Sequence, residues 1–202
     1  DRLKSKYSEK IADHEKDDFS KSLLIIGKQI KQIENLVNEF SDFARMPKPI
    51  LKDNNLVPLI KENIKLINEL DNKIIIDFKP DKPTILLNSD SEQLSRVFFN
   101  LIKNSIESIR DKKVDNADFK GKIDISINDN LEEINFMIID NGLGFGIFAD
   151  NIKDILNPYF TTKKKGTGLG LAIVNKIIND HNGKINFVSL KYGAKIEIMF
   201  IK

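Results

Sequence analysis

Residues 134–146 read INFMIIDNGLGFG, an apolar stretch that ends at Asp140 and continues directly into a run of glycines. The apolar part predicts a buried strand over residues 134–139. Glycine permits positive φ and a close approach of the backbone to a bound molecule. A carboxylate at a strand end, beside backbone that carries no side chains, can meet a flat polar ring. We therefore predict that Asp140, Gly142 and Gly144 contribute to a binding site.

A second glycine cluster stands directly before a helix predicted over residues 169–179. Backbone N–H groups at a helix N-terminus suit phosphate groups. Neither cluster has the spacing G-x-x-x-x-G-K or G-x-G-x-x-G, which argues against the P-loop and Rossmann folds. Each cluster alone is also compatible with an ordinary turn. The second cluster comprises Gly166, Thr167, Gly168, Leu169 and Gly170.

Three polar residues share one face of a helix predicted over residues 91–110. Asn100 and Asn104 are four residues apart, and Glu107 follows three residues later, so their side chains align. The surrounding positions are apolar, and buried polar groups need partners. Those partners are either one another, in an internal hydrogen-bond network, or a hydrated Mg²⁺, which takes few protein ligands.

The chain from residue 56 onward has the pattern of an α+β fold. Helical periodicity and strand alternation place helices on one face of a mostly antiparallel sheet. The pair 122–128 and 134–139 is predicted to form a hairpin. Predicted helices cover residues 56–70, 91–110 and 169–179, and predicted strands cover 73–78, 84–87, 122–128, 134–139, 184–189 and 194–201.

An apolar heptad seam marks a long helix predicted over residues 19–46. Its positions alternate spacings of three and four, the pattern of a coiled coil or a four-helix bundle. A single amphipathic helix cannot bury such a stripe alone, so the seam predicts dimerisation, with packing against its own chain as the alternative. The seam consists of Leu23, Ile26, Ile30, Ile33, Val37, Phe40 and Ala44.

The segments beside this helix predict a partial helical hairpin. Residues 1–12 carry a weaker helical pattern, and the acidic stretch 13–18 is interpreted as the turn between the two helices. Pro47 and Pro49 end the long helix, because proline lacks the backbone donor and clashes with the preceding turn. We interpret residues 47–55 as a linker.

Composition excludes several classes of protein. The 202 residues carry a net charge of +2, which argues against a protein that grips nucleic acid by charge. There is no cysteine, and the only histidines are His14 and His181, so disulfides, thiol nucleophiles and histidine-rich metal centres are excluded. No apolar run approaches the roughly 20 residues that cross a bilayer.

The motifs together resemble those of sensor histidine kinases. Asn100–Asn104 resembles the N box, Asp140–Gly144 the G1 box, Pro158–Lys163 the F box and Gly166–Leu171 the G2 box. They stand in the family's order with family-like spacing, so the chain is identified as a member of the GHKL family, whose ATP-binding domain has the Bergerat fold. The resemblance covers about residues 56–202.

A further segment resembles one branch of these kinases. Glu39–Pro49 is similar to the end of the second dimerisation helix in nitrogen-regulation, NtrY-like kinases. Glu107 stands where many sensor kinases carry lysine, and this branch often has glutamate there. The resemblance implies that residues 1–46 are part of a dimerisation and phosphotransfer hairpin, followed by the linker 47–55 and a catalytic ATP-binding domain over 56–202.

The resemblance implies a role for each matching residue. Asp140 would accept a hydrogen bond from the adenine amino group, while Gly142 and Gly144 would let the base lie against the backbone. Asn104 would be the Mg²⁺ ligand, and Asn100 would support the triphosphate. The lid over ATP would span residues 146–168. Lys163 would reach a terminal phosphate. The phosphates would be cradled through backbone N–H groups of the cluster Gly166, Thr167, Gly168, Leu169 and Gly170.

The acceptor histidine of such a kinase is followed by an acid and an Asn-Pro or Thr-Pro pair. His14 precedes Glu15 but has no proline near it, so we interpret it as a loop residue. His181 is interpreted as the end of a helix before a left-handed Gly183. We expect the acceptor upstream of Asp1, so that this chain binds ATP and Mg²⁺ without phosphorylating itself.

The resemblance also implies the reaction and the partners. The parent would transfer the γ-phosphate of ATP to its histidine and then to an aspartate of a response regulator receiver domain, as a cytoplasmic homodimer whose membrane anchoring is open. Two alternatives stand beside this hypothesis. A GHKL ATPase of the gyrase, mismatch-repair or chaperone type needs a glutamate where Asn100 stands, since asparagine cannot activate water. A non-catalytic dimerisation scaffold would use the seam alone.

Overall fold

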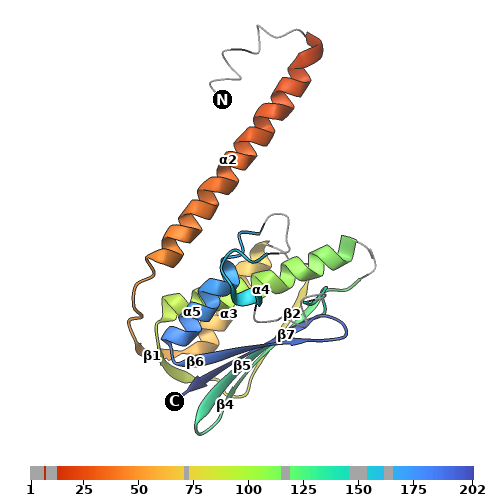
Figure 1. Ribbon diagram of the computed structural model, residues 1–202. Coiled ribbons are helices and arrows are strands. Elements are labelled where there is room, and N and C mark those ends of the chain that lie inside the picture. The colour runs from red at the N-terminus through yellow and green to blue at the C-terminus, as the bar shows by residue number, and fades with distance from the viewer. Residues whose placement is uncertain (1–6, 8–12, 71–72, 115–118, 146–153, 162–165) are drawn as a thin grey trace. The chain divides into compact units, whose positions relative to one another are not determined.

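The computed structural model describes residue 7 and residues 13–70, 73–114, 119–145, 154–161 and 166–202. The chain divides into two compact units, Asp1–Met46 and Pro47–Lys202, whose elements are labelled in Figure 1. Within the described ranges, none of the helices combines the length and the hydrophobicity that a membrane crossing requires.

The first unit is built on one long helix. A short 3-10 turn, η1 (Asp13–Glu15), leads into α2 (Lys16–Ala44). The predicted turn over 13–18 is therefore wrong in its second half, because Asp17 and Asp18 lie in the first turn of α2, where the positive end of the helix dipole favours acidic residues. The apolar seam of α2 is exposed, and Ile30 and Ile33 keep 60% and 61% of their surface in water.

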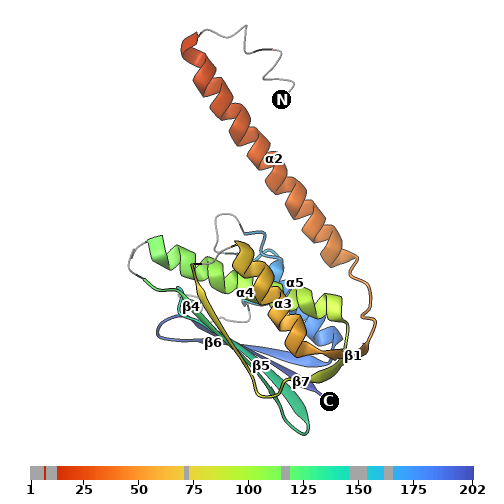
Figure 2. The ribbon, with the colours of Figure 1, turned by 180° about the vertical axis from the view of Figure 1, so that it is seen from behind.

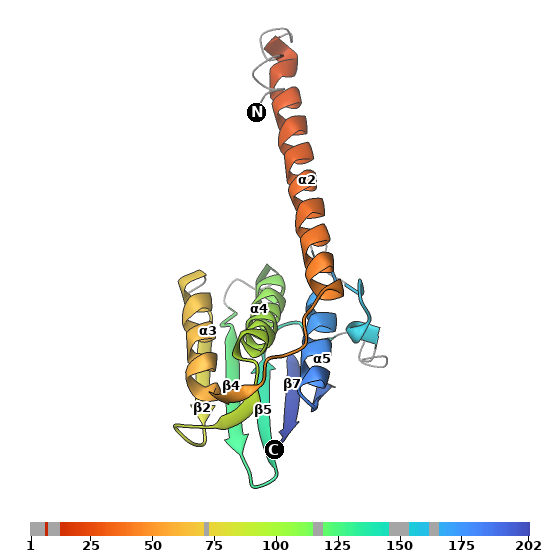
Figure 3. The same ribbon diagram turned by 90° about the vertical axis from the view of Figure 1, so that its left-hand side faces the viewer.

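The second unit is centred on a five-stranded sheet with the order β2-β4-β5-β7-β6, which Figure 3 shows for its first four strands. Only the pair β2–β4 is parallel, so the predicted, mostly antiparallel sheet is confirmed. The predicted hairpin of β4 and β5 is also present. The strands are β2 (Ile75–Pro80), β4 (Lys122–Asp129), β5 (Glu133–Asp140), β6 (Gly183–Ser189) and β7 (Ala194–Ile201).

Three helices cover one face of this sheet, as Figures 1 and 2 show: α3 (Leu56–Leu70), α4 (Ser91–Val114) and α5 (Gly170–Asp180). The predicted α+β sandwich is thus confirmed. The central helix α4 packs on β4 and β5. The rings of Phe98 and Phe136 meet there with centroids 4.9 Å apart, and both side chains are essentially excluded from water.

One strand of a small second sheet lies inside the stretch predicted as a linker. β1 (Lys52–Asn55) pairs antiparallel with β3 (Leu86–Ser89). β1 was not predicted, because Lys-Asp-Asn-Asn has no apolar alternation and gains its strand conformation from a partner distant in the sequence. Asn55 then caps α3, since its Oδ1 accepts the N–H groups of Val57 at 3.2 Å and Ile85 at 3.1 Å.

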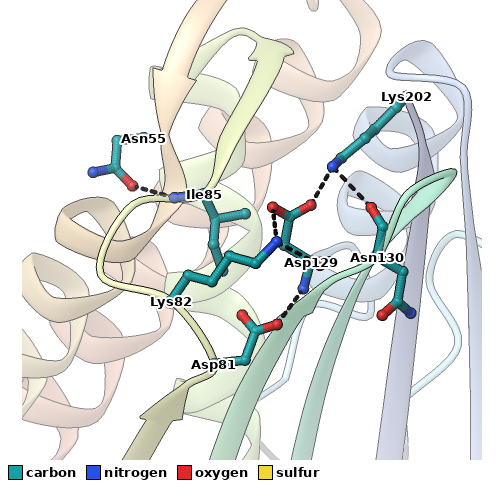
Figure 4. A network of polar contacts seen from close by, with 7 residues as sticks. All are labelled: Asn55, Asp81, Lys82, Ile85, Asp129, Asn130 and Lys202. Atoms are coloured by element: carbon teal, nitrogen blue, oxygen red, sulfur yellow. Dashed lines mark hydrogen bonds and ion pairs between the residues drawn. The ribbon is translucent and has the colours of Figure 1, made fainter.

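Asp129 ties together the end of the sheet that lies away from Asp140 (Figure 4). Its Oδ2 accepts from Nζ of Lys82 at 2.8 Å, its Oδ1 is paired with Lys202, and its N–H donates to Asp81 at 2.8 Å. These lysines hold the pKa of Asp129 below its usual value. A hollow of about 670 Å³ opens beside these groups. Because both lysines already face a carboxylate, we do not regard this hollow as the functional site.

Asp90 joins three segments at the start of α4. Its Oδ1 accepts the N–H groups of Glu92 at 3.1 Å and Gln93 at 3.0 Å, as an N-cap does, while its Oδ2 accepts the N–H of Ile50 at 2.9 Å. Its own N–H donates to Nε2 of His181 at 2.9 Å. One residue thus holds the chain before β1, the first turn of α4 and the end of α5.

His181 is a buried structural residue. It is only 6% exposed, and its Nδ1 lies 2.8 Å from the carbonyl oxygen of Ile177. Because Nε2 accepts from Asp90, the proton is on Nδ1, which donates to Ile177. The left-handed residue that follows is Asn182, with φ of 56°, so the prediction that Gly183 takes this conformation is wrong. Asparagine tolerates that region of φ and ψ.

We expect Asp90→Ala to destabilise the protein by about 1–2 kcal/mol near pH 7, the usual effect of losing an N-cap. Burial acts to raise the pKa of Asp90, but the N–H groups of Ile50, Gln93 and Glu92 and the nearby His181 together lower it. A carboxylate with a depressed pKa contributes stability above its unfolded pKa, near 3.9, and loses it as the pH falls further.

Urea unfolding at pH 7 and at about pH 3 tests this prediction. The difference between wild type and Asp90→Ala should shrink at the lower pH. Asp53→Ala is the matched control, because Asp53 is exposed on β1 and should change stability by less than about 0.5 kcal/mol. Equal losses for both variants would contradict the assigned role of Asp90.

Candidate functional site

Asp140 ends β5 on the buried face of the sheet. It continues the alternation of Ile134, Phe136 and Ile138, and it is only 5% exposed. Its Oδ1 accepts the N–H of Gly142 at 2.9 Å. Burial raises the pKa of Asp140 and outweighs the hydrogen bonds from Gly142, Ser105 and Ala194. A carboxylate so placed forms strong and directional hydrogen bonds, because little water competes for it.

The turn after Asp140 has no room for side chains. A Cβ on Gly142 would collide with Ser108 on α4. Gly144 has φ of 73°, and a Cβ there would lie 2.5 Å from the carbonyl oxygen of Gly193, in the turn between β6 and β7. The turn therefore passes between α4 and that second turn. Both glycines stand where the prediction placed them, next to the aspartate.

The two asparagines lie on one half-buried face of α4. Nδ2 of Asn100 donates to the carbonyl oxygen of Arg96 at 2.8 Å. Oδ1 of Asn100 lies against the first residue of α5, since a Cβ on Gly170 would be 3.5 Å from it. Asn104 follows one turn later on α4. The helix therefore places the amide group of Asn100 beside the N-terminus of α5, with the amide of Asn104 one turn further along the same face.

The second glycine cluster forms the entrance to α5. Leu169 is fully buried at the N-cap, where it offers no capping side chain, and its N–H lies 3.4 Å from Oγ1 of Thr167. The carbonyl oxygen of Gly168 accepts the N–H of Tyr159 at 3.1 Å. This bond joins the predicted F box to the predicted G2 box. Gly166 is exposed.

Most of the predicted site is thus brought to one side of α4. Asp140 and Gly142 meet its C-terminal half, Gly144 meets Gly193 just beyond them, and Gly170 meets its N-terminal half at Asn100. From Asn100 to Ser108 the helix axis rises by about 12 Å. Lys163 lies outside the described residues, as do 146–153 and 162–165 of the predicted lid. Among the described residues, no three His, Asp or Glu side chains gather as for a metal.

α4 carries a second polar row that was not predicted. Ser105, Ser108 and Lys112 follow one another at spacings of three and four, so they share a face, and each contacts Asp140 or the turn after it. Their spacing was the available signal. Ser105 bonds to the Asp140 side chain, whereas Ser108 and Lys112 bond to backbone groups of the turn. Backbone partners cannot be inferred from a pattern of side chains in the sequence.

Comparison with known proteins identifies the class. A family model described as "Histidine kinase-, DNA gyrase B-, and HSP90-like ATPase" matches residues 89–202, more than half of the chain. The chain belongs to this family, and the predicted membership is confirmed.

Individual relatives define the branch. The chain is 33% identical over 201 residues to a "Putative sensor histidine kinase NtrY-like" of Rickettsia felis, with 99% of this chain and 32% of the relative covered. It is 34% identical over 185 residues to "Nitrogen regulation protein NtrY" of Azorhizobium caulinodans, covering 92% and 23%. The resemblance to the NtrY-like branch is confirmed. The chain spans about a third or less of the length of these curated relatives.

A solved structure supports the fold. The nucleotide-free catalytic domain of histidine kinase ThkA matches with a TM-score of 0.64 and 29% identity, over 75% of this chain and 95% of that domain. The predicted GHKL architecture is therefore confirmed by both sequence and structure.

The raised pKa of Asp140 predicts that its charge destabilises the nucleotide-free protein at neutral pH. A carboxyl group whose folded pKa exceeds its unfolded value loses stability as the pH rises through that interval. We therefore expect Asp140→Asn to unfold at the same or a higher urea concentration than wild type at pH 7. This gain should disappear near pH 3.5. A clear loss of stability at pH 7 would contradict the assigned charge effect.

Proposed function

We propose that residues 56–202 form the ATP-binding catalytic domain of a sensor histidine kinase of the NtrY-like branch. The observation that carries this proposal is the buried Asp140 beside the asparagine face of α4, in a chain of the histidine kinase ATPase family. Asp140 would accept the adenine amino group. Gly142 and Gly144 would bring the base against the backbone, where a Cβ has no space.

The phosphates would lie further along α4, at the N-terminus of α5. Asn100 adjoins Gly170 there, and the first N–H groups of α5 have no capping side chain. Such groups favour anions. We propose that Gly166, Thr167, Gly168, Leu169 and Gly170 surround the phosphates through their backbone, and that Lys163 reaches the terminal one.

Mg²⁺ fits the oxygen chemistry of this face. The ion binds few protein oxygens and keeps several waters, which agrees with an amide side chain in place of a carboxylate cluster. We propose Asn104 as the protein ligand. Bound Mg²⁺ would supply neutralisation of phosphate charge, the main requirement of phosphoryl transfer beside positioning.

Neither histidine of the chain suits phosphoryl acceptance. His181 is buried and both ring nitrogens are engaged. His14 lies in η1 and lacks the proline motif of the family. We therefore propose that the γ-phosphate passes to a histidine elsewhere in the kinase, and from it to an aspartate of a response regulator receiver domain in the cytoplasm.

The exposed seam of α2 supports a homodimer. Ile26, Ile30, Ile33, Val37 and Phe40 are 45–61% exposed, and a second copy of α2 would cover them at a gain of about 25 cal/mol per Å². We propose that residues 1–46 supply this contact in the parent.

ATP binding tests the function directly. In calorimetry or fluorescent-nucleotide titration with Mg²⁺, wild type should bind ATP, and Asp140→Asn should bind at least about tenfold more weakly, since it loses a charged hydrogen-bond acceptor. Asp53→Asn, on the exposed side of β1, should bind as wild type does. No ATP binding by folded wild type at millimolar nucleotide would refute the proposal and leave a non-catalytic scaffold.

Asn104→Ala tests the metal assignment. We expect this variant to lose most of the difference in ATP affinity between Mg²⁺ and EDTA buffers, because it removes the proposed protein ligand. Asn128→Ala is the control, since Asn128 is exposed on β4 toward the end of the strand away from Asp140. An unchanged Mg²⁺ dependence in Asn104→Ala would remove the assignment.

A further inference from the structure

The second polar row of α4 meets the turn after Asp140 at three successive levels. Ser105 is 2% exposed and bonds to the Asp140 carboxylate. One turn later, Oγ of Ser108 accepts the N–H of Leu143 at 3.0 Å. One turn further, Lys112 reaches the backbone of the same turn. Each residue of the row therefore contacts Asp140 or the turn that follows it.

Lys112 makes the densest set of contacts in the row. Its Nζ donates to the carbonyl oxygens of Asn141 at 2.6 Å and of Gly142 at 3.0 Å. The ring centroid of Phe119 lies 4.6 Å from Nζ and that of Tyr192 lies 5.8 Å away. Aromatic faces attract a cation. The ammonium is thus held by two carbonyls and two rings, of which only the ring of Phe119 is close to Lys112 in the sequence.

The opposite side of the turn is fixed as well. Oδ1 of Asn141 accepts the N–H of Lys122 at 2.8 Å, and its Nδ2 donates to the carbonyl oxygen of Lys120 at 2.9 Å. Gly193 packs against the backbone of Asp140 so closely that it has no space for a Cβ. With the turn anchored here, Lys112 adds the engagement of the two carbonyls and a positive charge that acts on Asp140.

Those carbonyls bear on which base is accepted. The edge of adenine offers an amino donor and a ring acceptor. The corresponding edge of guanine offers the O6 acceptor in place of that amino group, followed by two donors, N1–H and the 2-amino group. Backbone carbonyls without a partner would attract those donors. A lysine bonded to both carbonyls competes with guanine for them, and the Asp140 carboxylate remains the acceptor for the amino group of adenine.

We propose that Lys112 is a positioning residue that sets the selectivity of this site for adenine over guanine nucleotides, with Ser108 as its support. This inference rests on the proposed function, because it concerns the same base-binding turn. Lys112 acts through the carbonyls of Asn141 and Gly142 and needs no contact with the nucleotide.

The test compares ATP and GTP affinities of Lys112→Met, Lys112→Arg and Lys112→Gln with those of Lys184→Met, whose lysine is exposed on β6 toward the end of the sheet away from Asp140. Lys112→Met should bind ATP about tenfold more weakly, as expected for the loss of charged hydrogen bonds, and its ATP-to-GTP affinity ratio should fall. Lys112→Arg, which keeps the charge and donors, should restore the ratio. Lys184→Met should match wild type.

Each possible result supports or overturns the proposed role of Lys112. A wild-type protein that binds no ATP overturns both this inference and the proposed function. Wild-type binding with an unchanged ratio in Lys112→Met overturns the inference alone, as does an equal loss of ATP and GTP affinity, which would assign Lys112 to the phosphates. Should Lys112→Met fail to fold, Lys112→Gln serves instead, because its uncharged amide NH2 group can still donate hydrogen bonds. Its ATP-to-GTP affinity ratio must then fall below that of wild type.

Discussion

A carboxylate on the core face of a sheet constrains the second unit of this chain. Asp140 follows three apolar residues of β5 in the same alternation, so its oxygens must be satisfied by protein groups. Gly142 and Ala194 supply backbone N–H groups and Ser105 a hydroxyl. Each donor requires a close approach of two segments. The glycine turns and the serines of α4 can be understood as solutions to this single requirement.

Periodicity predicted most of the elements, and its failures have physical causes. The helix α3 and the strand β7 have the predicted bounds, since most of their apolar side chains face one core. β1 was missed because its four polar residues form a strand only by pairing with β3, far along the chain. α4 continues to Val114 beyond its predicted end at Arg110. Its last turn includes Lys112, whose partners lie in other segments.

The residues of the candidate site also divide into those that the sequence predicts and those that it does not. Asp140 and the glycines can be predicted from the sequence, because an acid at the end of an apolar strand and a run of glycines stand together in one short stretch. The residues that support them cannot be predicted in this way. In the sequence, Ser108 and Lys112 resemble ordinary solvent-facing residues, and only the folded structure brings the turn at 141–143 against them. Asp90 and His181 resemble unrelated polar residues, although a 2.9 Å hydrogen bond joins them. Tertiary contacts to the backbone are invisible to side-chain patterns.

The bond between Asp90 and Ile50 has a mechanical consequence. The chain ahead of β1 is fastened by its backbone N–H to the carboxylate that also caps α4. A pull on that stretch is therefore transmitted directly to the first turn of α4, the helix that carries Asn100 and Asn104.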